Sequence, residues 1–258
     1  MPYFLYRGYH IYYEECGAGE PLLLLHGNSV SSRLFESVRG LYENSYRIIT
    51  LDFLGCGQSD RVEELPENMW YEQALQAIRL LELLGCQEVN IIGTSGGAIT
   101  ALNIALERPG LVRAVIADSL MGEGSREEFV RDLPSQREMG KRQREGQLFW
   151  EAQHGADWVR VVDWDTQAIV RQYQTKKGYF QKELLSLDVP VLLTGSGEDE
   201  LIPGIREVLA ALSEKIPNCP VLLFPHGSHP AMLSNAEEFA KEAKAFLRRP
   251  AHDECPIK

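Results

Sequence analysis

The sequence has few cysteines, no long apolar run and no excess of basic residues, and each absence excludes a class of protein. Its five cysteines are an odd number, widely spread, with no C-x-x-C spacing. This favours reduced thiols in a reducing compartment over a disulfide framework or a zinc site. No stretch approaches the roughly 18 consecutive apolar residues of a membrane span, and residues 1–7 lack the apolar core of a signal peptide. We therefore expect a cytoplasmic protein with no membrane partner.

The chain is acidic, with a formal net charge of -11 over 258 residues. Such a surface repels a phosphate backbone, so we expect no nucleic-acid partner. Hydrophobic residues make up 44% and charged residues 24% of the chain, which is typical of a globular enzyme with a substantial core. There is no internal repeat or low-complexity segment, and the length fits one large domain.

The pattern Gly-x-Ser-x-Gly occupies residues 93–97, between an apolar run at 89–92 and a helical run at 99–106. In that context the pattern is typical of a strand–turn–helix whose serine is exposed at the top of the turn. The flanking glycines suit it because the two backbones leave little room for side chains. Amides at the helix N-terminus stabilise negative charge beside the hydroxyl. Ser95 is therefore the candidate nucleophile, although the motif alone also occurs by chance in glycine-rich turns.

Buried strands alternate with amphipathic helices along most of the chain. After an N-terminal hairpin at 3–15, strands are predicted at 21–25, 46–51, 89–92, 111–117, 189–194 and 221–224, and helices at 33–42, 70–84, 99–106 and 236–247. This alternation predicts an α/β fold with a mostly parallel sheet covered on both faces. The site of such a sheet lies at the carboxyl ends of its strands.

The alternation breaks between residues 120 and 187, a charged segment of mostly helical pattern. We interpret residues 120–187 as a helical cap over the crevice, and residues 1–119 and 188–258 as the core. Trp150, Trp158 and Trp164 lie in this segment. They either join the cap to the core or line an apolar substrate pocket.

A serine hydroxyl needs a base with a pKa near neutrality, which points to histidine. His229 and His226 share the loop after strand 221–224. We favour His229 because it lies further from the strand and has more reach; a loop histidine that caps the last helix is the alternative. His10 in the hairpin and His252 in the polar tail are poorly placed, and His154 lies in the cap.

The histidine in turn needs a carboxylate that fixes its tautomer. Three acids follow strand 189–194 in the segment 198–200. We favour Asp199, with Glu198 second and Asp118, at the end of another strand, third. The acidic loop is alternatively a solvated turn or a helix start.

The tetrahedral oxyanion needs preorganised donors, usually two backbone N–H groups. One is expected from Gly96, directly after the nucleophile. The other is expected from Asn28, because Gly27 lets the backbone after strand 21–25 turn inward. His26 is expected to be structural, buried at the strand end.

These features together resemble the α/β-hydrolase superfamily over nearly the whole chain. The matching segments are His26-Gly27, the loop 52–59, the turn 93–97, Gly195…Asp199…Pro203 and Gly227-Ser228-His229. The resemblance implies the α/β-hydrolase fold, with about eight strands in a mostly parallel central sheet, helices on both faces and a helical cap inserted after the sixth strand. It also implies Ser95, Asp199 and His229 as the catalytic triad.

Within the superfamily, residues 93–102 and the short cap look like the valacyclovir hydrolase (biphenyl hydrolase-like) group of serine esterases, which cleaves α-amino acid esters. In that group an aspartate directly after the nucleophile binds the substrate ammonium, whereas this chain has Gly96. Asp118, Asp163 and Asp165 are the candidates to replace that charge.

We therefore expect hydrolysis of a small-molecule carboxylic ester through an acyl-enzyme, with no metal and no organic cofactor. Thioesters, lactones, amides and activated C–C bonds are alternative substrates. Two other classes remain open: a non-hydrolytic small-ligand-binding protein or receptor on this fold, and a scaffold whose charged cap docks a partner.

Overall fold

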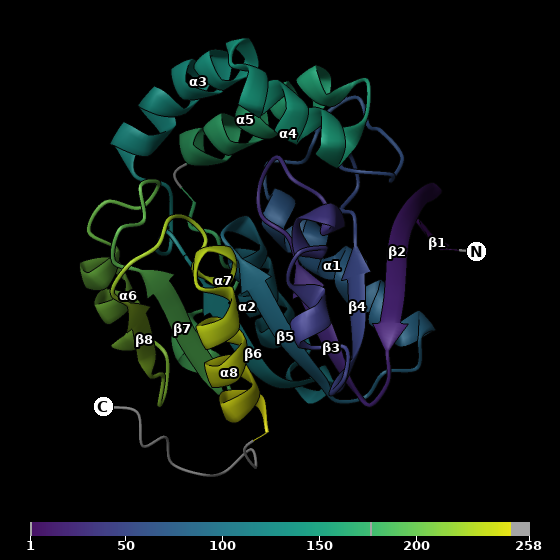
Figure 1. The fold of residues 1–258 in the computed structure, drawn as a ribbon, viewed down its shortest axis with the longest axis vertical. Helices are drawn as coiled ribbons and strands as arrows, with labels where there is room; N and C mark the ends of the chain where they lie inside the picture. Colours follow the sequence, from purple (N-terminus) through teal and green to yellow (C-terminus); the bar gives the residue numbers. More distant parts are fainter. Residues whose placement is uncertain (1, 176, 249–258) are drawn as a thin grey trace.

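The predicted strands join into one sheet. In the computed structural model, which describes residues 2–175 and 177–248, eight strands pair in the order β1-β2-β4-β3-β5-β6-β7-β8 (Figure 1). The strands are β1 (Tyr3–Tyr6), β2 (Tyr9–Gly17), β3 (Glu20–Leu25), β4 (Tyr46–Leu51), β5 (Val89–Thr94), β6 (Val112–Asp118), β7 (Val191–Ser196) and β8 (Val221–Phe224). β1–β2 and β2–β4 are antiparallel and all other neighbours are parallel. The mostly parallel sheet confirms the predicted fold class.

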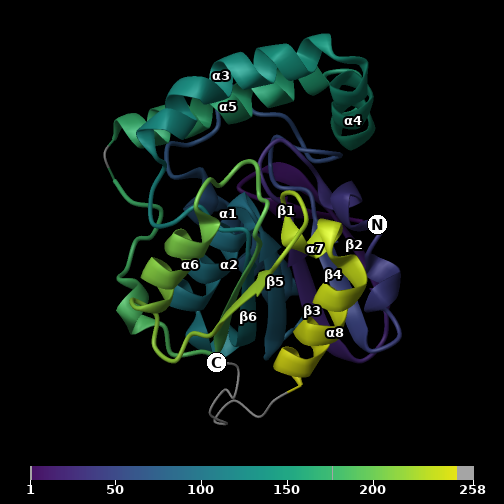
Figure 2. The same ribbon diagram turned by 60° about the vertical axis from the view of Figure 1, so that its left-hand side comes forward.

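Helices cover both faces of the sheet (Figure 2). α1 (Met69–Leu83), α2 (Gly96–Glu107) and α6 (Ile205–Ser213) pack on one face, and α8 (Ala236–Leu247) packs on the other. Leu23 and Leu25 of β3 join the first of these cores, whereas Leu22 and Leu24 join the second. Because successive side chains of a strand point to opposite faces, a strand buried on both faces needs the continuous apolar run seen in the sequence.

Three helices lie above the carboxyl ends of the strands (Figure 1). They are α3 (Glu127–Arg142), α4 (Arg144–His154) and α5 (Trp158–Gln174), which follow β6 in the chain, and we call them the cap helices. Side chains tie them to the core: Ser31 donates its backbone N–H to Gln153 Oε1 at 2.9 Å, and Arg61 pairs with Asp157 at 2.9 Å. Within residues 2–175 and 177–248, no helix is both long enough and apolar enough to cross a membrane.

The helix predicted at 33–42 is wrong in type. The structure has two 3₁₀-helices there, Ser32–Phe35 and Arg39–Leu41. The two side chains that anchor the segment, Phe35 and Val38, are both buried and lie three residues apart. That spacing suits the three-residue turn of a 3₁₀-helix as well as an α-helix, so the apolar pattern did not separate the two.

Candidate active site

Ser95 stands at a sharp turn between β5 and α2. Its φ is +56°, in the left-handed region, and its backbone N–H donates to the carbonyl of Asp118 at 2.8 Å. A Cβ at Gly93 would lie 2.1 Å from the carbonyl oxygen of Gly97, and a Cβ at Gly97 would lie 2.1 Å from that of Leu25. The two glycines are therefore required by backbone contact, and the turn presents the serine at the carboxyl edge of the sheet.

His229 and Asp199 lie on two neighbouring loops of the same edge, after β8 and β7. His229 Nδ1 is 2.8 Å from Asp199 Oδ2, and the two side chains are 9% and 0% exposed. The other oxygen, Oδ1, accepts the backbone N–H groups of Leu201 at 3.0 Å and Ile202 at 2.9 Å. The backbone N–H of His229 donates to Glu200 Oε2 at 3.0 Å. Asp199 is thus held as a hydrogen-bond acceptor for the imidazole.

The competing acids lie elsewhere. Glu198 pairs with His226 at 3.0 Å, and these side chains are 64% and 83% exposed. Asp118 is buried and accepts hydrogen bonds from the Thr194 hydroxyl at 2.8 Å and the Met232 N–H at 3.0 Å. Burial raises the pKa of Asp118 to about 6. Neither Glu198 nor Asp118 contacts the His229 ring through a hydrogen bond within the part of the chain that the structure describes.

Among the described residues, no other histidine forms a hydrogen bond with Asp199. His26 is buried, as expected, and its Nε2 accepts a hydrogen bond from the backbone N–H of Phe53 at 3.2 Å. His10 is exposed, and His154 accepts the backbone N–H of Gly57 at 3.0 Å. Burial lowers the pKa of His154 to about 4. His252 lies outside the described residues.

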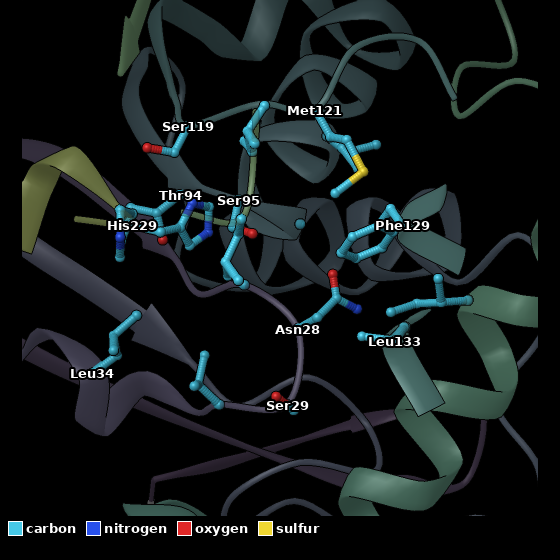
Figure 3. Close-up of a pocket in the computed structure, with 18 of the residues that line it drawn as sticks. Asn28, Ser29, Leu34, Thr94, Ser95, Ser119, Met121, Phe129, Leu133 and His229 are labelled. Atoms are coloured by element: carbon cyan, nitrogen blue, oxygen red, sulfur yellow. The ribbon is translucent and has the colours of Figure 1, made fainter. Parts of the chain in front are cut away.

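A cavity of about 420 Å³ lies between the core and the cap helices, and both Ser95 and His229 line it. Figure 3 shows the imidazole of His229 on one side of Ser95 and the side chain of Asn28 on the other. Most of the remaining wall is apolar and comes from both layers: Ile99, Met121, Phe129, Leu133, Trp150, Ile169, Tyr179 and Leu233. The cavity therefore suits a small, largely apolar molecule next to the serine.

The two residues predicted to supply oxyanion donors, Asn28 and Gly96, also line the cavity. The carboxamide of Asn28 is fixed from two sides: Oδ1 accepts the Trp70 Nε1–H at 3.2 Å, and Nδ2 donates to Asp165 Oδ1 at 2.7 Å. A Cβ at Gly96 would lie 2.2 Å from Asn28 Oδ1. No side chain fits at residue 96 in this arrangement, so an aspartate directly after the nucleophile is excluded unless Asn28 moves.

None of the three acids considered as a replacement for that aspartate lines the cavity. Asp118 lies beneath the His229 loop, and Asp163 pairs with Lys141 on the surface of the cap helices. Asp165 is buried on α5 between Asn28 and Arg137. Among the described residues that line the cavity with Ser95, the permanently charged side chain is a cation, Arg137.

The tryptophans of the cap helices divide between the two roles expected for them. Trp150 lines the cavity and stacks on Trp158 with ring centroids 5.7 Å apart, while Trp164 packs against the core with Arg160 over its ring. No motif in the sequence indicates Trp70, Arg137 or the structural role of Asp165. Asp165 gave one signal: it lies four residues from Val161 and Ile169, on the apolar stripe of its helix.

The chain matches the alpha/beta hydrolase family over residues 22–242 and belongs to it. Among curated proteins it is 27% identical to the serine hydrolase BPHL of Mus musculus, over 94% of this chain and 84% of that protein. It is 24% identical to a proline iminopeptidase of Clostridium botulinum, over 96% and 97%. These relatives are hydrolases, and the first supports the resemblance to the biphenyl hydrolase-like group.

Solved structures show the same fold. An alpha/beta hydrolase from a Medee basin deep-sea metagenome library, MGS-M2, superposes with a TM-score of 0.76 at 20% identity, over 97% of this chain and 98% of that one. Est816, described as an N-acyl homoserine lactone degrading enzyme, gives a TM-score of 0.75 at 18% identity, over 95% and 100%. At these identities the likeness concerns the α/β-hydrolase fold alone.

Proposed function

We propose that the protein is a serine hydrolase of small carboxylic esters, with Ser95 as nucleophile, His229 as base and Asp199 as the acid that orients it. The observation that carries the proposal is the pair His229 Nδ1–Asp199 Oδ2 at 2.8 Å, on an imidazole that lines the same cavity as Ser95. A histidine whose Nδ1–H is held by a buried carboxylate keeps Nε2 free to accept a proton.

In the acylation step, Ser95 Oγ forms a bond to the ester carbonyl carbon and its proton passes to His229 Nε2. The carbonyl oxygen becomes an oxyanion, which the N–H groups of Gly96 and Asn28 stabilise. When the tetrahedral intermediate collapses, the C–O bond to the alcohol breaks and His229 returns the proton to the leaving oxygen. Asp199 stabilises the transient imidazolium throughout.

Deacylation repeats these steps with water as the nucleophile. His229 takes one proton from the water molecule while the water oxygen bonds to the acyl carbon. His229 then returns that proton to Ser95 Oγ as the carboxylic acid leaves. Ser95, His229 and one water molecule account for every bond and proton exchanged in the cycle, so the proposed reaction needs no metal or organic cofactor.

The mostly apolar cavity of about 420 Å³ favours short esters over polymers. The relatives' names leave other acyl substrates open, because they include an iminopeptidase and, among solved folds, a lactone-degrading enzyme. We keep thioesters, lactones, amides and C–C bonds as alternative substrates and rank them behind esters.

A fluorophosphonate probe and a panel of p-nitrophenyl esters and amino-acid esters test the proposal. We expect covalent labelling of the wild type and of Ser135→Ala, an exposed serine of α3, but not of Ser95→Ala. Ester turnover should follow the same order. Absence of labelling in the folded wild type would reject the mechanism and favour a non-hydrolytic ligand-binding protein.

The thiols of Cys16, Cys56 and Cys86 are free, which supports our proposal of a reducing, cytoplasmic location. Cell fractionation checks it: the protein should follow a cytoplasmic marker, and recovery in an oxidising compartment would contradict it.

A further inference from the structure

Arg137 of α3 lines the same cavity as Ser95, yet its hydrogen-bonding capacity is mostly unused. Its side chain is 18% exposed, and its guanidinium carries five N–H donors. Within residues 2–175 and 177–248 its one hydrogen bond is to the hydroxyl of Ser29. Nη2 forms an ion pair with Asp165 Oδ2 at 3.6 Å, which is too long for a hydrogen bond, and among the described residues the buried Nε has no hydrogen-bond partner. Donors left in this state cost free energy, which an acceptor entering the cavity would recover.

Asp165 does not occupy the hydrogen-bond donors of Arg137. Its Oδ1 is taken by the Asn28 carboxamide at 2.7 Å, and its Oδ2 has no hydrogen-bond partner among the described residues. Burial lowers the pKa of Arg137 and raises the pKa of Asp165, so both charges are poorly solvated where they lie. An arginine remains protonated at any such pKa, and its planar fork binds a carboxylate with two parallel hydrogen bonds.

The cation lies on the Asn28 and Ser29 side of the cavity. Arg137 donates a hydrogen bond to the hydroxyl of Ser29, which follows Asn28 in the chain. The Asn28 carboxamide lies against Gly96. His229 is on the other side of Ser95 (Figure 3). The leaving alcohol receives its proton from the imidazole and so lies on the His229 side. An acyl chain directed away from the leaving alcohol would therefore run toward the Asn28 and Ser29 side of the cavity, where Arg137 lies.

We propose that Arg137 binds a carboxylate at the far end of the acyl group, and that the preferred substrates are monoesters of small dicarboxylic acids. This inference rests on the proposed esterase function and narrows its substrate class. Phe129, Leu133 and Trp150 supply the apolar wall against which the methylenes between the two carboxyl groups pack. Arg137 is then a specificity-determining residue in contact with substrate.

Two matched esters test this on the intact protein. Monoethyl glutarate and ethyl 5-methylhexanoate have the same shape, with a terminal carboxylate replaced by an isopropyl group. A charge-assisted contact predicts that the wild type prefers the glutarate in kcat/KM by about tenfold or more. Arg137→Gln should abolish the preference mainly through a raised KM for the glutarate. Arg137→Lys should keep part of it, and Arg142→Gln, an exposed arginine of the same helix, should keep all of it.

A wild type that cleaves both esters equally, or favours the neutral one, overturns the inference while leaving the esterase proposal intact. Equal losses on both esters in Arg137→Gln also overturn it, because they would mean that the arginine only fastens α3 to the core. If Arg137→Gln does not fold, the wild-type preference and Arg137→Lys decide. If neither ester is cleaved and Ser95 is not labelled by the fluorophosphonate, the proposed function itself fails.

Discussion

Replacing Asp199 by Asn is the substitution whose consequence the site geometry defines most sharply. The carboxylate accepts three hydrogen bonds, from the N–H groups of Leu201 and Ile202 and from His229 Nδ1. An asparagine keeps its oxygen for the two backbone donors and turns its amide N–H₂ toward the imidazole. His229 Nδ1 must then accept, which places the ring proton on Nε2. A protonated Nε2 cannot take the proton of Ser95.

The change therefore removes the base while leaving the cavity unaltered. In serine hydrolases of known mechanism this tautomer exchange lowers kcat by roughly 10⁴-fold, equivalent to about 5.5 kcal/mol at about 1.4 kcal/mol per factor of ten. We expect a loss of that size in kcat for Asp199→Asn and a nearly unchanged KM, because no group that contacts bound ester is removed.

Steady-state hydrolysis of p-nitrophenyl acetate measures both parameters, with circular dichroism as the check of folding. Glu198→Gln is the matched control, since Glu198 lies one residue away and pairs with His226 on the surface; it should keep wild-type kcat. Retention of more than about one tenth of kcat in Asp199→Asn, or a large loss in Glu198→Gln, would refute the assignment of the acid.

Three further predictions concern stability. Asn90 of β5 is fully buried, and its amide has no hydrogen-bond partner in the described part of the chain, so Asn90→Val should raise the free energy of unfolding by about 1–3 kcal/mol in urea titrations. His154 has a folded-state pKa of about 4 against a reference value of 6.5, so the unfolded chain binds its proton first as pH falls through this window. Between pH 7 and 5 the wild type should lose about 2 kcal/mol that His154→Gln does not lose. Gly97→Ala places a Cβ 2.1 Å from a backbone oxygen and should prevent recovery of folded protein, whereas Gly110→Ala meets open space and should fold normally.

Each stability prediction has its own contrary result. A destabilised Asn90→Val would mean that water or a neighbouring group bonds the amide. Parallel pH profiles for wild type and His154→Gln would mean that His154 titrates normally. A soluble, folded Gly97→Ala would mean that β3 and α2 separate at little cost.

The gathering of Ser95, Asp199 and His229 at one edge was predictable because it follows from topology. Ser95, Asp199 and His229 lie on the segments that follow β5, β7 and β8. The parallel strands of one sheet end at the same edge. The turn at Ser95 was also predictable from the sequence, because its glycines are required by backbone contacts within a few residues and with β3. The Asp199–His229 pair at 2.8 Å is the geometry expected of these loops; the roles of all three residues are what the experiments above test.

The environment of Arg137 was not predictable, because it depends on how the cap helices are oriented over the core. Helical periodicity shows which residues share a face, but not which core loop that face meets. The bond from Asn28 to Asp165 spans 137 positions of sequence, and no local pattern reports it. For the same reason the sequence predicts only a helix at residues 70–84, although the indole N–H of Trp70 in that helix donates to the Asn28 carboxamide.

The most direct measurement of the central claim is a crystal structure of the fluorophosphonate adduct. We predict a bond from phosphorus to Ser95 Oγ, and a phosphonyl oxygen about 2.7–3.1 Å from the amide nitrogens of both Asn28 and Gly96. His229 Nε2 should lie within about 3.2 Å of Ser95 Oγ. An adduct on another residue, an oxygen directed away from both amides, or an imidazole out of reach of the serine would contradict the mechanism.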